Sequence, residues 1–159
     1  MALFGILAAL TYAAKFAMAM LPNIEPVSLF VMLFAVVFGW KAVYPIYLYV
    51  MLEILFGGFG LWNINYLYIW AILALAAAGM RKQTHPLSWA LLSGAYGLAF
   101  GALCAPVDLF IGGFGYAASK WVSGIPFDVA HCIGNFAIAL LLFKPMRGIL
   151  EKLYGTMKS

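Results

Sequence analysis

The sequence predicts an all-α membrane protein with six transmembrane helices and both termini on the cytoplasmic side. Of the 159 residues, 67% are hydrophobic and 9% are charged, whereas soluble domains contain roughly 45–50% apolar and about 25% charged residues. At a mean hydropathy of +1.03, too few polar residues remain to cover the surface of a soluble protein. We therefore expect one integral membrane domain over residues 1–159, embedded in a lipid bilayer and without a nucleic-acid partner.

The six helices are predicted from apolar runs, because a bilayer core requires about 20 apolar residues per helix, within a range of roughly 17–25. The first run has no small-residue cleavage site followed by a polar segment, so we expect a membrane helix there and not a signal peptide. The second and third runs are short for a span. Five or seven helices would fit the charges less well. The six runs are 3–22, 27–40, 42–57, 64–80, 88–110 and 127–146.

The basic residues predict the orientation, because cytoplasmic loops carry an excess of Lys and Arg. With the N-terminus inside, Lys120 is the only basic residue outside, and Lys15 lies within the first helix. The acidic Glu25 falls outside, and Asp108 and Asp128 fall near the outer surface. The basic residues predicted to be cytoplasmic are Lys41, Arg81, Lys82, Lys144, Arg147, Lys152 and Lys158.

The string Gly-Gly-Phe-Gly occurs twice, at 57–60 and at 112–115, both in predicted outer loops. Glycine permits positive φ and close backbone approach, so we expect both loops to turn tightly near the membrane surface. After the second string, 116–123 is predicted to be a short interfacial helix with Lys120 and Trp121 at headgroup depth.

A polar stripe on the last helix is the strongest functional signal. Asp128, His131 and Asn135 are spaced by three and four residues, so a helix places them on one face. A charged side chain inside a membrane helix costs roughly 2.5–3.5 kcal/mol on insertion scales. The stripe must therefore face protein, water or a ligand. A structural hydrogen-bond network between helices is the alternative.

Other polar and aromatic residues are predicted to lie at the same outer end. Small-molecule sites combine aromatic walls with a few placed polar groups, which makes these residues candidates for substrate binding together with the stripe. An aromatic belt at the interface is the alternative for the Trp and Tyr residues. The additional candidates are Glu25, Trp62, Asn63, Asn65, Tyr66 and Trp121.

Two charges lie within predicted helices, Lys15 in the first and Glu53 in the third. They could pair, be neutralised or meet a charge on the substrate, while snorkelling to the interface is the alternative for Lys15.

Small residues also recur every four positions on two helices, where they permit close helix approach. We expect one of these ridges to pack internally and the other to meet a partner. The ridges are Gly5, Ala9, Ala13 and Ala17, and Ser93, Gly97, Gly101 and Ala105.

The chain contains no motif of an enzyme or an ATPase. It has no Gly-rich phosphate loop, no HExxH and no GxSxG. Asp128 and His131 resemble an acid–base couple, but Ser123 is only a weak candidate nucleophile. Cys104 and Cys132 lie in apolar contexts and are expected to be reduced thiols. We expect no catalytic activity, metal or cofactor.

The chain resembles the substrate-binding S component of energy-coupling factor transporters, over about residues 3–150. The resemblance rests on the Ala9-x-x-x-Ala13 pattern, on Leu-Pro-Asn-Ile-Glu-Pro at 21–26 and on Phe-Gly-Leu-Trp at 59–62. Its most specific part is the stretch Pro-Phe-Asp-x-x-His-x-x-x-Asn at 126–135. Parts of it are similar to a subgroup that includes predicted cobalamin transporters.

The resemblance implies a function and a set of partners. An S component in a bacterial plasma membrane binds a vitamin from outside, here cobalamin or another heterocyclic vitamin. It then docks on a membrane coupling subunit that carries two ATPase subunits, and it topples to release the vitamin inside. Ala9 and Ala13 would contact the coupling subunit. The pocket would take Asp128, His131 and Asn135 from the sixth helix, and Trp62, Asn63 and Asn65 from the loop after the third.

Two other classes of membrane protein are compatible with the sequence. MreD-type scaffold proteins have a similar size and six-helix plan, but they have no need for an inward-facing polar stripe. A small intramembrane enzyme using Asp128 and His131 is the third class, and it would lack a nucleophile or metal.

Overall fold

The computed structural model describes residues 1–21 and 24–156, and these residues form helices and connecting turns without a strand. The prediction of an all-α protein is therefore confirmed for this part of the chain. Lys158, one of the predicted cytoplasmic residues, lies outside the described residues. The elements are α1 (Ala2–Ala17), α2 (Val27–Phe38), the 3₁₀ turn η1 (Gly39–Ala42), α3 (Val43–Gly57), α4 (Leu61–Gly79), α5 (Pro86–Leu98) and α6 (Phe100–Thr156).

The number of membrane-spanning helices differs from the prediction. By length and composition, three helical stretches of the described chain are suited to cross a membrane, and Ala2–Ala17 is a shorter apolar helix. With this shorter helix included, the described chain has four apolar helical stretches and not the six that were predicted. The reason is that α2 has 12 residues and α5 has 13, too few for a bilayer core, and each runs on into the next helix. The three long stretches are Val27–Gly57, Leu61–Gly79 and Pro86–Thr156.

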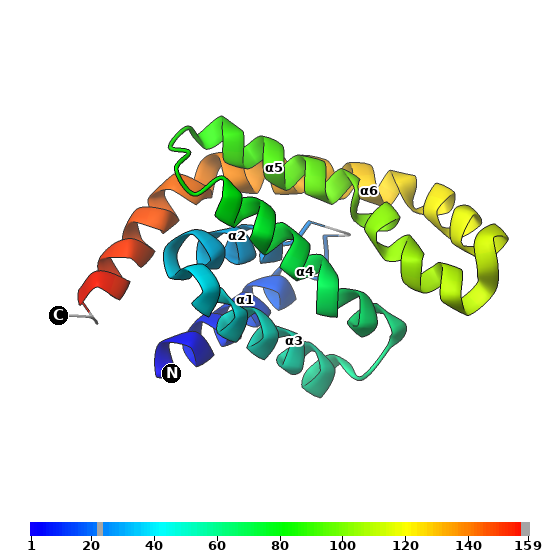
Figure 1. The fold of residues 1–159 in the computed structure, drawn as a ribbon, viewed down its shortest axis with the longest axis horizontal. Coiled ribbons are helices and arrows are strands. Elements are labelled where there is room, and N and C mark those ends of the chain that lie inside the picture. The colour runs from blue at the N-terminus through cyan, green and yellow to red at the C-terminus, as the bar shows by residue number, and fades with distance from the viewer. Residues whose placement is uncertain (22–23, 157–159) are drawn as a thin grey trace.

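The course of the chain nevertheless reverses inside two of these stretches (Figure 1). Gly39, at the end of α2, has a φ of 59°, and α3 runs back from there. Gly113 has non-helical dihedrals inside α6, which divides that element into a first arm, 100–112, and a second arm, 114–156. The second arm returns beside α5 and bends again toward the C-terminus (Figure 1).

The two Gly-Gly-Phe-Gly strings adopt the same backbone feature, as the sequence predicts. Gly58 and Gly113, the second glycine of each string, have φ values of 80° and 75°. Only glycine takes this conformation without a steric cost. The predicted interfacial helix at 116–123 is helical, but it is continuous with the second arm of α6.

Helix α2 forms the centre of the bundle. Apart from Ser28 it is apolar, as expected of a helix that is surrounded by others, and its residues from Val27 to Ala35 are all buried. Around Trp70 of α4, which is fully buried, lie the rings of Tyr49, Tyr66, Tyr96 and Phe100.

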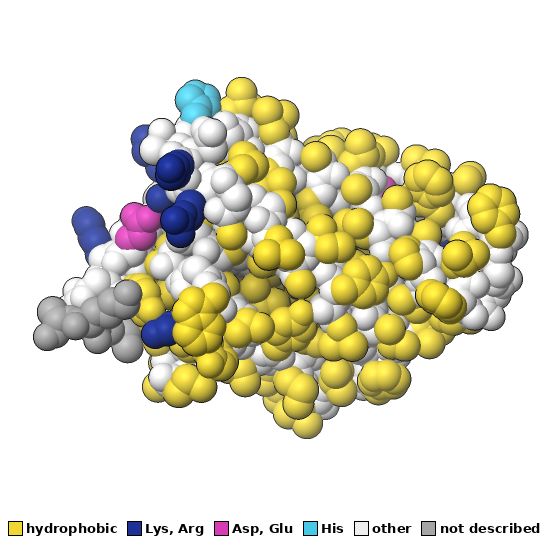
Figure 2. Space-filling view, viewed as in Figure 1, with side chains coloured by type: hydrophobic (Ala, Val, Ile, Leu, Met, Phe, Trp, Pro, Cys, Tyr) yellow, Lys and Arg dark blue, Asp and Glu magenta, His cyan; other side chains and the backbone are white. Residues whose placement is uncertain are grey.

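Charged side chains gather at one end of the molecule (Figure 2). This is the end where both termini, η1 and the turn between α4 and α5 lie (Figure 1). The remainder of the visible surface is mostly hydrophobic (Figure 2), which is the surface expected for contact with lipid. The basic residues of these elements are Lys41, Arg81, Lys82, Lys144, Arg147 and Lys152.

Candidate functional site

A cavity of about 540 Å³ lies between the start of α4 and the two arms of α6, at the end opposite the charged one. We call it the aromatic cavity. Four of the residues predicted for substrate binding line it: Trp62, Asn65, Trp121 and Asp128. The remaining lining residues are Leu61, Gly101, Cys104, Asp108, Lys120, Ser123, Gly124 and Phe127.

Asp128 is the polar centre of the aromatic cavity. Its carboxylate accepts the backbone N–H of Gly101, with distances of 3.1 Å to Oδ1 and 3.2 Å to Oδ2. The residue is 5% exposed, and within the described residues it has no ion-pair partner. A carboxylate can accept several more hydrogen bonds. Asp128 is therefore able to receive a donor group from a bound molecule.

The close contact between Gly101 and Asp128 depends on the absence of a side chain at position 101. A Cβ there would lie 2.5 Å from Asp128 Oδ2 and 3.1 Å from Cδ1 of Trp121. Gly101 was expected only as part of a packing ridge. Its importance for the carboxylate could not be seen in the sequence, because the contact joins two segments that are 27 residues apart.

An ion pair connects the two arms of α6 at the rim of the aromatic cavity. Lys120 Nζ lies 2.6 Å from Asp108 Oδ1, and it also lies over the ring of Tyr116 at 5.6 Å from the centroid. The pair spans the reversal at Gly113, with one residue on each side of it. Opposite charges on the two sides of a predicted turn are a signal from which the sequence could have predicted the pairing.

The aromatic walls of the aromatic cavity are accessible to a ligand. Trp62, Trp121 and Phe127 are 52%, 45% and 54% exposed. Asn65, in contrast, is buried, and its Oδ1 lies 2.9 Å from the hydroxyl of Tyr68. With the carboxylates of Asp108 and Asp128 and the ammonium of Lys120, the cavity has a net charge of −1 when all three groups are ionised.

Five predicted residues do not line the aromatic cavity: Asn63, His131, Asn135, Glu25 and Tyr66. Asn63 Oδ1 accepts the N–H of Gly60 at 2.6 Å and caps the start of α4. His131 is 3% exposed and packs edge-on against Phe100, with 4.9 Å between the ring centroids. The polar stripe of α6 therefore reaches the cavity only at Asp128.

Asn135, the deepest residue of the stripe, connects three helices. Its Nδ2 donates to Ser28 Oγ of α2 at 3.0 Å, and it lies 3.4 Å from the carbonyl oxygen of Ser93 of α5. The residue is 1% exposed. These contacts correspond to the structural network that was the alternative interpretation of the stripe.

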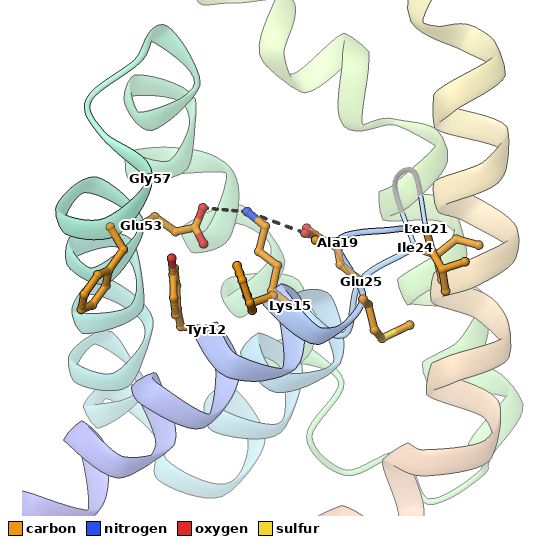
Figure 3. A pocket seen from close by; sticks show the side chains of 11 residues that line it. Tyr12, Lys15, Ala19, Leu21, Ile24, Glu25, Glu53 and Gly57 are labelled. Atoms are coloured by element: carbon orange, nitrogen blue, oxygen red, sulfur yellow. Dashed lines mark hydrogen bonds and ion pairs between the residues drawn. The ribbon is translucent and has the colours of Figure 1, made fainter.

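Glu25 lies at a second cavity, which we call the charged cavity (Figure 3), and Tyr66 contacts one of its lining residues, Lys15. Glu25 lines it, and Tyr66 Oη lies 3.4 Å from Lys15 Nζ, which donates to it. Lys15 also pairs with Glu53 at 2.7 Å and with Glu25 at 3.8 Å. Burial raises the pKa of the Glu25 carboxyl above its ordinary value, an effect that the nearby Lys15 opposes.

The two small-residue ridges have different environments. A Cβ at Gly97 would lie 2.9 Å from the backbone of His131 and Cys132, so this ridge packs internally between α5 and α6. On α1, in contrast, Ala9 and Ala13 are exposed. Cys104 and Cys132 are both free and half-buried.

No protein-family model matches this chain, and neither a curated protein nor a solved structure matches it. A functional proposal therefore depends on the geometry of the site together with the sequence.

Proposed function

We propose that this protein is the substrate-binding membrane subunit of a vitamin importer of the energy-coupling factor class. The observation that carries the proposal is the aromatic cavity, which is lined by Trp62, by Trp121 and by a carboxylate, Asp128, without an ion-pair partner in the described chain. Small-molecule sites combine apolar and aromatic walls with a few polar groups in this way.

The proposed protein is a multi-pass protein of a bacterial plasma membrane, with both termini in the cytoplasm. The stretches Val27–Gly57, Leu61–Gly79 and Pro86–Thr156 support this placement, because each is long and apolar enough to cross a membrane. The basic residues at the end that holds both termini support the orientation (Figure 2), since Lys and Arg are enriched on the cytoplasmic side. The aromatic cavity then opens outward, where a nutrient is captured.

The chemistry of the aromatic cavity favours a compact heterocycle that carries a hydrogen-bond donor. Trp62, Trp121 and Phe127 offer faces for stacking, and Asp128 offers an acceptor for an N–H group of the ring or an amino substituent. A volume of about 540 Å³ is within the range for small-molecule sites. It fits a vitamin of one or two rings better than the much larger corrinoid ring of cobalamin.

The proposed partners are a membrane coupling subunit and two ATPase subunits. Ala9 and Ala13 are exposed on α1 and allow another helix to approach closely. The sequence has no Gly-rich phosphate loop, so in this proposal the energy of uptake comes from the ATPases.

The first test is native mass spectrometry of the protein purified in mild detergent. A thermal-shift screen against thiamine, riboflavin, biotin, pyridoxine, niacin and cobalamin follows. We expect one heterocycle to be retained or to stabilise the protein, and we expect Asp128→Asn and Trp62→Ala to weaken its binding about tenfold or more. The proposal is rejected if a monodisperse protein neither retains nor responds to any of them. It is also rejected if binding is unchanged in both variants.

A further inference from the structure

The charged cavity is a second site, separate from the aromatic cavity. It has a volume of about 550 Å³ and lies among the end of α1, the described residues 18–21 and 24–25, and the end of α3. The two cavities share no lining residue. The residues that line the charged cavity are Tyr12, Lys15, Phe16, Met18, Ala19, Leu21, Ile24, Glu25, Glu53, Phe56 and Gly57.

The charges of this cavity leave one carboxylate incompletely neutralised. Lys15 Nζ lies between two acids, 2.7 Å from Glu53 Oε2 and 3.8 Å from Glu25 Oε2 (Figure 3). The shorter distance is that of a charge-assisted hydrogen bond, and the longer one is not. Two carboxylates and one ammonium leave a net charge of −1 when all are ionised, and the excess lies on the side of Glu25.

Two helix ends reinforce this negative potential. α1 ends at Ala17 and α3 ends at Gly57, and residues at both ends line the cavity. The C-terminus of a helix carries a partial negative charge and favours cations. Both dipoles therefore act in the same direction as the carboxylates.

Three of the other lining residues are aromatic, and the rest are small or apolar. The rings of Tyr12 and Phe56 are in contact, with centroids 5.5 Å apart, and Phe16 is 73% exposed beside them. Aromatic faces attract organic cations through their quadrupole. A metal ion is a poorer fit, because the described residues contain no cluster of three or more His, Cys, Asp or Glu side chains.

We propose that the charged cavity binds an organic monocation of the alkylammonium class. Its charge pairs with Glu25, its alkyl groups contact Phe16 and Tyr12, and Glu53 stays paired with Lys15. The site does not depend on the proposed function, because a cation bound here touches no residue of the aromatic cavity.

Choline is the probe, and its uncharged isostere 3,3-dimethylbutan-1-ol is the matched control. Binding is measured by isothermal titration calorimetry on the full chain in mild detergent at low ionic strength. The variants are Glu25→Gln and Phe16→Leu, with Asp128→Asn as the control in the aromatic cavity. All are first checked for a monodisperse elution profile and an unchanged helical circular dichroism spectrum.

We expect choline to bind and the isostere to bind at least tenfold more weakly. Glu25→Gln should weaken choline binding about tenfold or more, Phe16→Leu should weaken it several-fold, and Asp128→Asn should leave it within twofold. Equal binding of both compounds, or no choline binding, would overturn the proposal. The proposal would also be wrong if Asp128→Asn abolished choline binding while Phe16→Leu and Glu25→Gln did not. Failure here leaves the retained-vitamin experiment unaffected, so the two proposals are tested separately.

Discussion

The backbone N–H of Gly101 donates to both carboxylate oxygens of Asp128, at 3.1 and 3.2 Å. This contact holds the acid at the wall of the aromatic cavity, and it exists because position 101 has no Cβ. One helix, the first arm of α6, thus positions the central polar group of another, the second arm.

Gly101→Ala should weaken binding of the retained molecule, because the new Cβ would lie 2.5 Å from Asp128 Oδ2 and must displace it. We expect a loss of about tenfold, or ~1.4 kcal/mol, measured by calorimetry. Gly115→Ala is the matched control, since a Cβ there has no neighbour within 4 Å. Equal affinity in Gly101→Ala and in the control would show that the position of Asp128 does not matter.

Asn135→Ala should act on stability more than on binding. It removes the hydrogen bond to Ser28 and the contact with Ser93 between buried helices. Interhelical hydrogen bonds in membrane proteins contribute about 0.6 kcal/mol on average and up to about 1.7 kcal/mol, so we expect a loss in that range. Reversible unfolding in mixed micelles measures it. A loss of ligand affinity with unchanged stability would instead show that Asn135 belongs to the binding site.

Replacing Ala9 or Ala13 with Trp should block uptake without weakening binding. Both residues are exposed and do not line the aromatic cavity, so a bulky side chain is tolerated by the fold but prevents close approach of the coupling subunit. Uptake is measured in cells with radiolabelled substrate, and binding with the purified variant. Leu75→Trp, at an exposed position on α4 and away from α1, is the control. Normal uptake in both Ala9→Trp and Ala13→Trp would show that this face of α1 does not dock on the coupling subunit.

Choline binding at the charged cavity should strengthen as the pH rises through the pKa of the Glu25 carboxyl. Burial raises the pKa of Glu25 above its ordinary value of 4.5, so at acidic pH the carboxyl is protonated and attracts no cation. Deprotonation creates the negative charge that the ligand pairs with. Lys15 and Glu53 also face this group. The same titration on Glu25→Gln should be flat, and a similar slope in that variant would assign the dependence to another group.

Much of the fold could be predicted from the sequence because it follows from local chemistry. Apolar runs give the helices, and the paired glycines give the reversals at Gly58 and Gly113. The predicted number of membrane-spanning helices was wrong. By length and composition, α2 and α5 are too short to cross a bilayer on their own, and each runs on into the following helix. Where a short helix joins the next one depends on packing and not on local pattern.

The candidate site could be predicted only in part. Spacing correctly places Asp128 and Asn135 on the same side of a helix, but seven residues along a helix cover about 10.5 Å. Asp128 therefore reaches the cavity, while Asn135 is covered by α2 and α5. Glu25 was grouped with the stripe, yet it lies at the charged cavity beside Lys15. These differences depend on contacts between distant segments, which one sequence does not reveal.

The most direct test of the central claim is the affinity of the retained heterocycle for the wild-type protein and for Asp128→Asn, measured by calorimetry in the same detergent. This substitution preserves the shape of the side chain and removes its charge. We predict binding in the wild type and a loss of about tenfold or more in the variant, with unchanged folding. Equal affinities would contradict the assignment of the aromatic cavity as the substrate site.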